Sequence, residues 1–216
     1  MKKYFVILMA LMLALSVFSG CNKPAEEVKS GDETEITNGE ISGETEEGKK
    51  EVTDEVSLPF KEPMGFYFSS GAGAWATELY LEKDGSFTGG FHDTNMGEIG
   101  DENPYGTCYV CNFSGKFEIT EKISETAYKM KLSEIKTEKE EGESWIEDGV
   151  LYVASTPYGI DGGTEFILYT PETKADSVSE EFLWWWPERF SEEVPETLMH
   201  YGIHNVETND GFFTYE

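Results

Sequence analysis

WATELYLEKDGSFTGGF, residues 75–91, is the stretch that decides the fold class of this chain. From Trp75 to Leu81 every second side chain is apolar or threonine, and the positions between them include Glu78. A period of two is typical of a strand that buries one face. The Asp-Gly step at residues 84–85 suits the positive φ of a tight turn, so the stretch predicts a β-hairpin.

Similar strand signals recur along the rest of the chain, separated by turns rich in glycine. They are Thr107 to Phe113, continuing past a candidate bulge at Gly115 to Thr120; Tyr128 to Ser133; Val150 to Ala154 after a turn at residues 147–149; Glu165 to Tyr169; and a last hairpin around residues 209–211. Short strands at this spacing predict an antiparallel meander that closes into a barrel or a sandwich. We therefore expect a mostly β protein.

One short helix is expected near residues 179–186. Asp176, Ser177 or Ser179 can each cap its N-terminus, and the two glutamates that follow suit the positive end of the helix dipole. Pro187 should end the helix or kink it.

Composition and charge exclude several classes of protein. The chain has 216 residues, of which 43 are acidic and 16 basic, giving a formal net charge of −27. Hydrophobic residues make up 38%, enough for one packed domain but not for a bundle of membrane helices. A collagen-like, coiled-coil or wholly disordered chain is excluded. Nucleic acid is not an expected partner, because its recognition needs a basic surface.

The N-terminus has the pattern of a targeting segment. Met1–Lys3 is positively charged, and Tyr4–Phe18 is apolar but shorter than the ~20 residues of a spanning helix. The ending Phe18-Ser19-Gly20-Cys21 resembles the lipobox of bacterial lipoproteins. That resemblance implies that residues 1–20 are a signal peptide and that Cys21 carries a lipid anchor on the extracytoplasmic face of the cell membrane. An ordinary secretory signal followed by an unrelated cysteine is the alternative.

The segment that follows Cys21 has the composition of a spacer. Residues 22–57 contain twelve acidic and four basic residues and no aromatic residue. This composition cannot bury a core, so residues 21–57 are predicted to be a disordered acidic linker. Residues 58–216 then form a single mostly β domain with a formal charge of −21. An anionic membrane surface repels such a body, which suits a position away from the lipid headgroups.

Three stretches of the body also resemble a group of uncharacterised lipoproteins of Gram-positive gut bacteria. They are residues 75–93, residues 105–117 and residues 157–171, within a region of similarity from Phe66 to Trp186. The resemblance implies the same location, and it carries over no catalytic residue.

Cys108 and Cys111 form the only Cys-x-x-Cys pattern. In a strand, residues three apart lie on opposite faces with Cα atoms about 10 Å apart, whereas a disulfide needs about 4.4–6.8 Å. Structural thiols are therefore the first interpretation, and a bridge in a distorted strand or thiol chemistry are the alternatives.

His200 and His204 have the spacing of two zinc ligands on one helix. The glutamate that follows the first histidine in metalloproteases is replaced by Tyr201, and Gly202 disfavours a helix. A metal site at these histidines is therefore the weaker interpretation.

The loop from Asp93 to Asn103 carries the oxygen-bearing side chains that hard cations prefer. Asp93, Asn95, Glu98 and Asp101 are the candidate ligands for calcium. The loop is not an EF-hand, because Glu98 stands where that motif requires glycine. A solvated acidic loop without metal is the alternative, and no other cofactor is expected.

Trp184, Trp185 and Trp186 are the strongest candidates for contact with a ligand. Successive helical residues turn by about 100°, so three neighbouring side chains cannot all face one core. An exposed indole would offer a platform for a sugar, an apolar ligand or a partner surface. The alternative is a helix that closes the barrel end, with every ring used in packing.

Together these features predict a membrane-anchored lipoprotein with a β-rich, non-enzymatic ligand-binding or interaction domain. No nucleophile, base or metal triad stands out in the sequence. The alternatives are a structural envelope protein without a ligand, and a surface hydrolase whose carboxylate pair is hidden among the 31 acidic residues of the body. The ligand itself, a small molecule or a surface partner, is left open.

Overall fold

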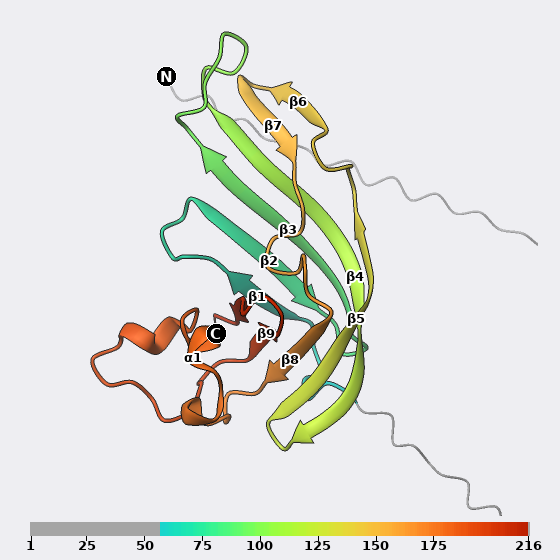
Figure 1. The fold of residues 1–216 in the computed structure, drawn as a ribbon, viewed down its shortest axis with the longest axis vertical. Helices are drawn as coiled ribbons and strands as arrows, with labels where there is room; N and C mark the ends of the chain where they lie inside the picture. The colour runs from blue at the N-terminus through green and yellow to red at the C-terminus, as the bar shows by residue number, and fades with distance from the viewer. Residues whose placement is uncertain (1–56, 216) are drawn as a thin grey trace, which may run out of the picture. The chain divides into compact units, whose positions relative to one another are not determined.

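The computed structural model describes residues 57–215, and ten strands dominate this part of the chain (Figure 1). The strands are β1 (Met64–Phe68), β2 (Trp75–Leu81), β3 (Ser86–Asn95), β4 (Thr107–Ser124), β5 (Ala127–Thr137), β6 (Ser144–Glu147), β7 (Val150–Ala154), β8 (Glu165–Tyr169), β9 (Gly202–Asn205) and β10 (Gly211–Phe213). The helical elements are α1 (Glu180–Leu183) and two short 3-10 helices, Ala175–Ser177 and Pro187–Phe190. None of the helices in the described part is long and apolar enough to cross a membrane. The predicted signal peptide, Cys21 and the predicted linker up to residue 56 lie outside the described residues.

Eight of the strands form a closed antiparallel barrel, which confirms the predicted fold class. The neighbours around the barrel are β1, β2, β3, β4, β5, β8, β9 and β10, and β10 pairs with β1 to close it. The barrel strands follow one another in chain order, with β6 and β7 inserted after β5 and the helical segment inserted after β8, so the barrel is an up-and-down meander. A single register pair, Tyr67 with Phe213, joins β1 to β10.

The stretch that predicts the fold forms the β2–β3 hairpin, in which Trp75 lies opposite Asp93. Gly85 in the turn has a φ of +83°, and a Cβ at this position would lie 2.1 Å from the carbonyl oxygen of Phe117. The turn therefore requires glycine both for its backbone conformation and for its close approach to β4.

Inward-facing side chains fill the barrel. The strand residues of this core that are at most 4% exposed are Phe66, Phe68, Leu79, Leu81, Phe87, Cys111, Phe113, Phe117, Met130, Phe166, Leu168, Ile203 and Phe212. Their rings are in contact, with centroids 4.6 Å apart for Phe87 and Phe117 and 4.8 Å apart for Phe117 and Phe166. An eight-stranded barrel is just wide enough for side chains to fill, so the interior is a packed core.

A segment before the first strand covers one end of the barrel. Leu58 and Phe60 are buried in the same core at the end where β1 begins. Phe60 packs edge-on against Tyr201, with 6.0 Å between ring centroids.

The loop of residues 155–164 closes the opposite end. Ile160 in this loop is 1% exposed and belongs to the interior core. Gly159 has a φ of +87°, and a Cβ there would lie 2.6 Å from a ring carbon of Phe68. The side-chain amide of Asn205 in β9 donates a hydrogen bond to the carbonyl oxygen of Gly159 at 3.0 Å. The loop is therefore fixed to the barrel by packing and by a buried hydrogen bond.

A second buried cluster lies on the outer face of the barrel, over β8, β9 and β10. It is formed by Phe182, Trp186 and Leu198 together with the outward-facing Phe213. Phe182 stacks on Phe213 with 4.8 Å between centroids and packs against Tyr169 at 5.3 Å. This cluster attaches α1 to the barrel and thereby positions the tryptophans that follow it.

The observed α1 is shorter than the helix expected near residues 179–186. Ser179 is its N-cap, and its hydroxyl accepts a hydrogen bond from the backbone N–H of Phe182 at 3.2 Å. The helix ends at Leu183, and Trp186 already has extended backbone with φ −68° and ψ 128°. Proline disfavours helical backbone in the residue before it, so Pro187 moves the end of the helix further back than its own position suggests.

β4 joins the barrel to an extension of the sheet. One of its partners near the start is β7, which runs parallel to it with Thr107 opposite Leu151, and β6 pairs with β7 in turn. Figure 1 shows the β6–β7 hairpin beside the upper end of β4, where β3 pairs with the other edge of β4. This parallel pair lies outside the predicted antiparallel meander and adds to it. The pairing of distant segments depends on the whole fold and leaves no local sequence signal.

The bulge expected at Gly115 is also corrected. The register places Lys116 opposite Glu134 and Phe117 opposite Leu132, so the extra residue lies on β5. Gly115 instead allows a close approach, because a Cβ there would lie 2.3 Å from the carbonyl oxygen of Glu134.

Candidate functional site

The three consecutive tryptophans occupy three different environments. Trp184 is 61% exposed, Trp185 is half-buried, and Trp186 is 2% exposed. The indole N–H of Trp186 donates to the carbonyl oxygen of Leu198 at 2.8 Å inside the second cluster. Trp186 is therefore a packing residue, and only Trp184 and Trp185 are available for contact with a ligand.

Trp185 reaches from the outer face of the barrel to its end. Its indole N–H donates to the carbonyl oxygen of Asn209, in the β9–β10 turn, at 3.1 Å. Its ring packs edge-on against Phe68, with centroids 4.7 Å apart, and lies 6.2 Å from Trp75.

These contacts belong to a larger cluster of rings, which we call the aromatic mouth: Phe68, Trp75, Phe91, Tyr158, Trp185 and Phe212. Phe68 and Phe212 are fully buried and form its floor, while Tyr158 is 43% exposed. The ring of Tyr158 lies 5.3 Å from that of Trp75. Burial and the nearby charges of Asp210 and Asp93 raise the pKa of Tyr158. The aromatic mouth is the outermost layer of rings at the end of the barrel that the loop of residues 155–164 closes.

Sequence reasoning does not identify most of the aromatic mouth. Trp75 reads as an ordinary inward-facing strand residue, and Tyr158 reads as part of a glycine-rich loop. The available signal is that Trp75 begins its strand, since an inward-facing ring at a strand end must lie near a barrel opening. The position of Tyr158 depends on how the loop folds back, which the local sequence does not contain.

A groove lies beside Trp185, between α1 and the β9–β10 turn. Its volume is about 500 Å³, and it is lined by Glu180, Glu181, Trp184, Trp185, Thr208, Asn209 and Asp210. We call it the acidic groove, because three of these residues are acidic and none is basic. It is continuous with the aromatic mouth through Trp185, which belongs to both.

Asp210 is the half-buried carboxylate of the acidic groove. Burial raises its pKa, while a hydrogen bond from the Thr208 hydroxyl at 2.6 Å and the neighbouring His204 oppose this effect. His204 lies on β9, with its Nε2 3.2 Å from the side-chain oxygen of Asn209, and burial lowers its pKa. The floor of the groove is thus a hydrogen-bonded turn.

Arg189 lies over the exposed ring of Trp184. It is the only arginine in the chain. Its guanidinium carbon is 4.5 Å from the ring centroid of Trp184 and 4.4 Å from that of Phe190, which is 77% exposed. Both distances are in the range of cation–π contacts. Among the described residues, Nη1 of Arg189 is buried without a hydrogen-bond partner.

The two histidines expected as possible zinc ligands do not form a helical pair. Gly202–Asn205 is strand β9, and His204 lies within it. His200 lies before the strand, with its Nε2 2.7 Å from Oε1 of Glu188. The zinc interpretation is therefore wrong, because it requires both side chains on one face of a helix.

The structure does not gather the candidate calcium ligands. Asp93 and Asn95 lie at the end of β3, and Glu98 and Asp101 lie in the following loop. Glu98 Oε2 instead accepts a hydrogen bond from the hydroxyl of Tyr109 at 3.0 Å. In residues 57–215, no three acidic, histidine or cysteine side chains are placed to hold a metal ion.

Cys108 and Cys111 are both free thiols. They lie three residues apart on β4, Cys111 in the interior core and Cys108 partly exposed. Burial, with smaller contributions from Asp161 and Glu138, raises the pKa of Cys111 to about 11. A thiol with so high a pKa is a packing residue, as the strand geometry predicts.

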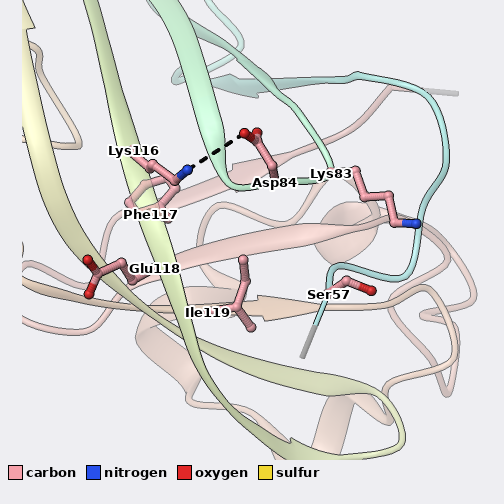
Figure 2. Close-up of a pocket in the computed structure, with 7 residues that line it drawn as sticks. All are labelled: Ser57, Lys83, Asp84, Lys116, Phe117, Glu118 and Ile119. Carbon is pink, nitrogen blue, oxygen red and sulfur yellow. Dashed lines mark ion pairs between the residues drawn. The ribbon is translucent and has the colours of Figure 1, made fainter. Parts of the chain in front are cut away.

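A larger hollow lies near the other end of the barrel, beside the β2–β3 turn. Figure 2 shows the residues that line it, which are Ser57, Lys83, Asp84, Lys116, Phe117, Glu118 and Ile119; its volume is about 710 Å³. Asp84 and Lys116 form an exposed ion pair at 3.6 Å. This hollow contains both acidic and basic side chains, and its only aromatic ring, Phe117, is fully buried. It therefore lacks the uniform charge and the exposed ring that the acidic groove has.

Family models, curated proteins and solved structures were compared with this chain, and none matched. The class that the fold defines is an eight-stranded up-and-down barrel with a packed interior. Its candidate site is the acidic groove and the adjoining aromatic mouth.

Proposed function

We propose that the protein is a lipoprotein, anchored through Cys21 on the extracytoplasmic face of the cell membrane, whose barrel carries a non-enzymatic ligand-binding site. The observation that supports binding most directly is the acidic groove with the exposed Trp184 at its wall. Its volume of about 500 Å³ lies within the range of about 300–1,000 Å³ that is usual for small-molecule sites. Exposed aromatic side chains grouped at a hollow are typical of binding surfaces.

The packed interior supports a site on the surface of the barrel. Barrels that carry ligands internally leave space between their inward-facing side chains. Here Phe68 and Phe212, the floor of the aromatic mouth, are fully buried, and Ile160 closes the same end. A ligand would therefore bind at the mouth and groove, where Trp185 joins the two.

A structural envelope protein without a ligand is the second candidate. The packed interior favours it, because a filled barrel is a stable body that needs no ligand. It gives no account of Trp184 and Phe190, which are 61% and 77% exposed and cost free energy in contact with water.

Cell fractionation and fluorescence together test the proposal. In wild-type cells the chain should be membrane-bound and incorporate labelled fatty acid, and Cys21→Ser should release it unlabelled. The released Cys21→Ser chain should then change its tryptophan emission with at least one compound in a panel of sugars, lipids, peptides and amines. Trp184→Ala should abolish that change, whereas Trp145→Phe, far along the chain on β6, should not.

The two parts of the proposal fail separately. Equal membrane association of the wild type and Cys21→Ser, without labelled fatty acid, would refute the anchor. A panel that leaves the emission of the wild type unchanged would refute the binding site and favour the structural candidate.

A further inference from the structure

We propose that the acidic groove binds a small organic cation with more than one ammonium group, of the class of linear alkyl polyamines. This inference rests on the proposed ligand-binding function and names the chemistry of its ligand. It is carried by the combination of two indole walls and three carboxylates around one hollow.

The charges of the groove select a cation. Glu180 and Glu181 lie in the first turn of α1, and Asp210 ends the turn on the opposite side. None of the seven lining residues is basic. The hollow near the other barrel end differs in this respect, because it contains Lys83 and Lys116 beside its acidic residues. An anionic ligand would meet repulsion from both sides of the groove.

The indole rings select an organic cation over a metal ion. Trp184 and Trp185 offer apolar faces that a hydrated metal ion cannot use. Ammonium groups and the methylenes beside them are attracted to such faces, by cation–π interaction and by burial of apolar surface. Arg189 already lies over Trp184, with its guanidinium carbon 4.5 Å from the ring centroid, so a ligand in the groove would use the exposed part of this ring that Arg189 leaves free.

The number of carboxylates selects more than one ammonium group. A ligand with a single charge would neutralise one of the three carboxylates and leave either Asp210, the half-buried one, or the α1 pair without an ammonium group beside it. A linear polyamine places charges at several points along an apolar chain. Its ends can meet the carboxylates on the two sides while its methylenes lie against the indoles.

Calorimetry with spermidine on the full chain carrying Cys21→Ser tests this inference. We expect saturable one-to-one binding, and much weaker effects of 1,8-octanediol, tetramethylammonium and Mg²⁺ at equal ionic strength. Glu180→Gln with Glu181→Gln should raise the Kd at least about tenfold, the effect of losing about 1.4 kcal/mol of contact energy. Trp184→Ala should raise it by a similar factor.

The matched control is Glu192→Gln with Glu193→Gln. It removes the same charge from two consecutive exposed residues of the same segment that do not line the groove. We expect its Kd to stay within about twofold of the parent, as for weakly coupled surface charges. Circular dichroism of each variant checks that the barrel is intact. If Trp184→Ala does not fold, the comparison of Glu180→Gln with Glu181→Gln against the control pair tests the inference alone.

Two results would overturn the inference. One is equal weakening by the groove pair and the control pair, since binding would then reflect only the overall charge. The other is spermidine binding no tighter than Mg²⁺. If another compound of the panel then changes the emission in a way that Trp184→Ala abolishes, the ligand-binding function is supported and only the polyamine is refuted. If no compound does so, both the polyamine and the ligand-binding function are refuted.

Discussion

Gly159 shows how much the closed end of the barrel depends on one residue. Its φ of +87° disfavours every L side chain, and a Cβ would also lie 2.6 Å and 2.8 Å from ring carbons of Phe68 and Phe212. Gly159→Ala should therefore lower the free energy of unfolding by at least about 2 kcal/mol, from backbone strain and overpacking together. Urea unfolding measures this loss.

Gly162→Ala separates the two causes. Gly162 lies in the same loop with a similar φ of +76°, but a Cβ there would meet only ordinary contact with Thr208 at 3.5 Å. We expect its loss of stability to be about 1 kcal/mol, from strain alone. Equal losses in the two variants would contradict the packing of Gly159 against the floor of the aromatic mouth.

For single residues, the sequence predicts that neighbouring side chains face different ways, but it does not predict which of them is buried. Helical geometry correctly implies that Trp184, Trp185 and Trp186 cannot share one core, but it does not say which ring is exposed. Strand alternation correctly separates Cys108 from Cys111. The choice among the tryptophans depends on where Leu198 and Asn209 present free carbonyl oxygens, and both lie on segments distant in sequence.

At the element scale, the cap of α1 determines where one wall of the acidic groove lies. The Ser179 hydroxyl satisfies the backbone N–H of Phe182, and a serine N-cap replaced by alanine costs about 1 kcal/mol. Ser179→Ala should therefore lower the Tm by about 2–4 °C, the shift usual for a domain of this size. Differential scanning calorimetry measures it.

Ser191→Ala is the control for this substitution. Ser191 follows the 3-10 helix Pro187–Phe190 on the same segment, and only its backbone N–H caps that helix. Its Tm should stay within about 1 °C of the parent, as for an ordinary surface change. A Ser179→Ala variant that melts like Ser191→Ala would show that α1 is held by the packing of Phe182 alone.

Hairpins are the elements that the sequence predicts best. The sequence predicts the β2–β3 and β9–β10 hairpins, and for β6–β7 it predicts the turn and β7 but not β6; Gly85 and Gly149 adopt the positive φ that their turns need. β1 has no such turn before it and escapes prediction. The parallel β4–β7 pair escapes it too, since its register depends on which edge of β4 the other barrel strands leave free.

At the scale of the whole molecule, charge should govern stability. Residues 58–216 carry a formal charge of −21, and self-repulsion opposes a compact state. Raising the ionic strength from 0.01 M to 0.15 M shortens the Debye length from about 30 Å to about 8 Å, so the Tm should rise. Millimolar Ca²⁺ and Mg²⁺ at equal ionic strength should raise it equally, because Asp93, Glu98 and Asp101 are not gathered into a ligand set.

A greater rise with Ca²⁺ than with Mg²⁺ would contradict this and support the predicted calcium loop. Binding to the native state stabilises it by mass action, so a specific ion adds to the effect of screening. Asp93→Asn with Asp101→Asn would then remove the additional rise.

The junction between β1 and β10 has a single register pair, Tyr67 with Phe213, and is therefore the sparsest backbone pairing around the barrel. The β2–β3 and β3–β4 ladders contain seven and ten register pairs, whereas β1 and β10 come from opposite ends of the described chain. Local opening begins where backbone pairing is sparse. Among the barrel strands, β1 and β10 should therefore show the fastest amide hydrogen exchange. The barrel should open first between these two strands. Phe182 stacks on Phe213 of β10, so this contact outside the barrel should stabilise the β1–β10 junction and slow the opening of the barrel.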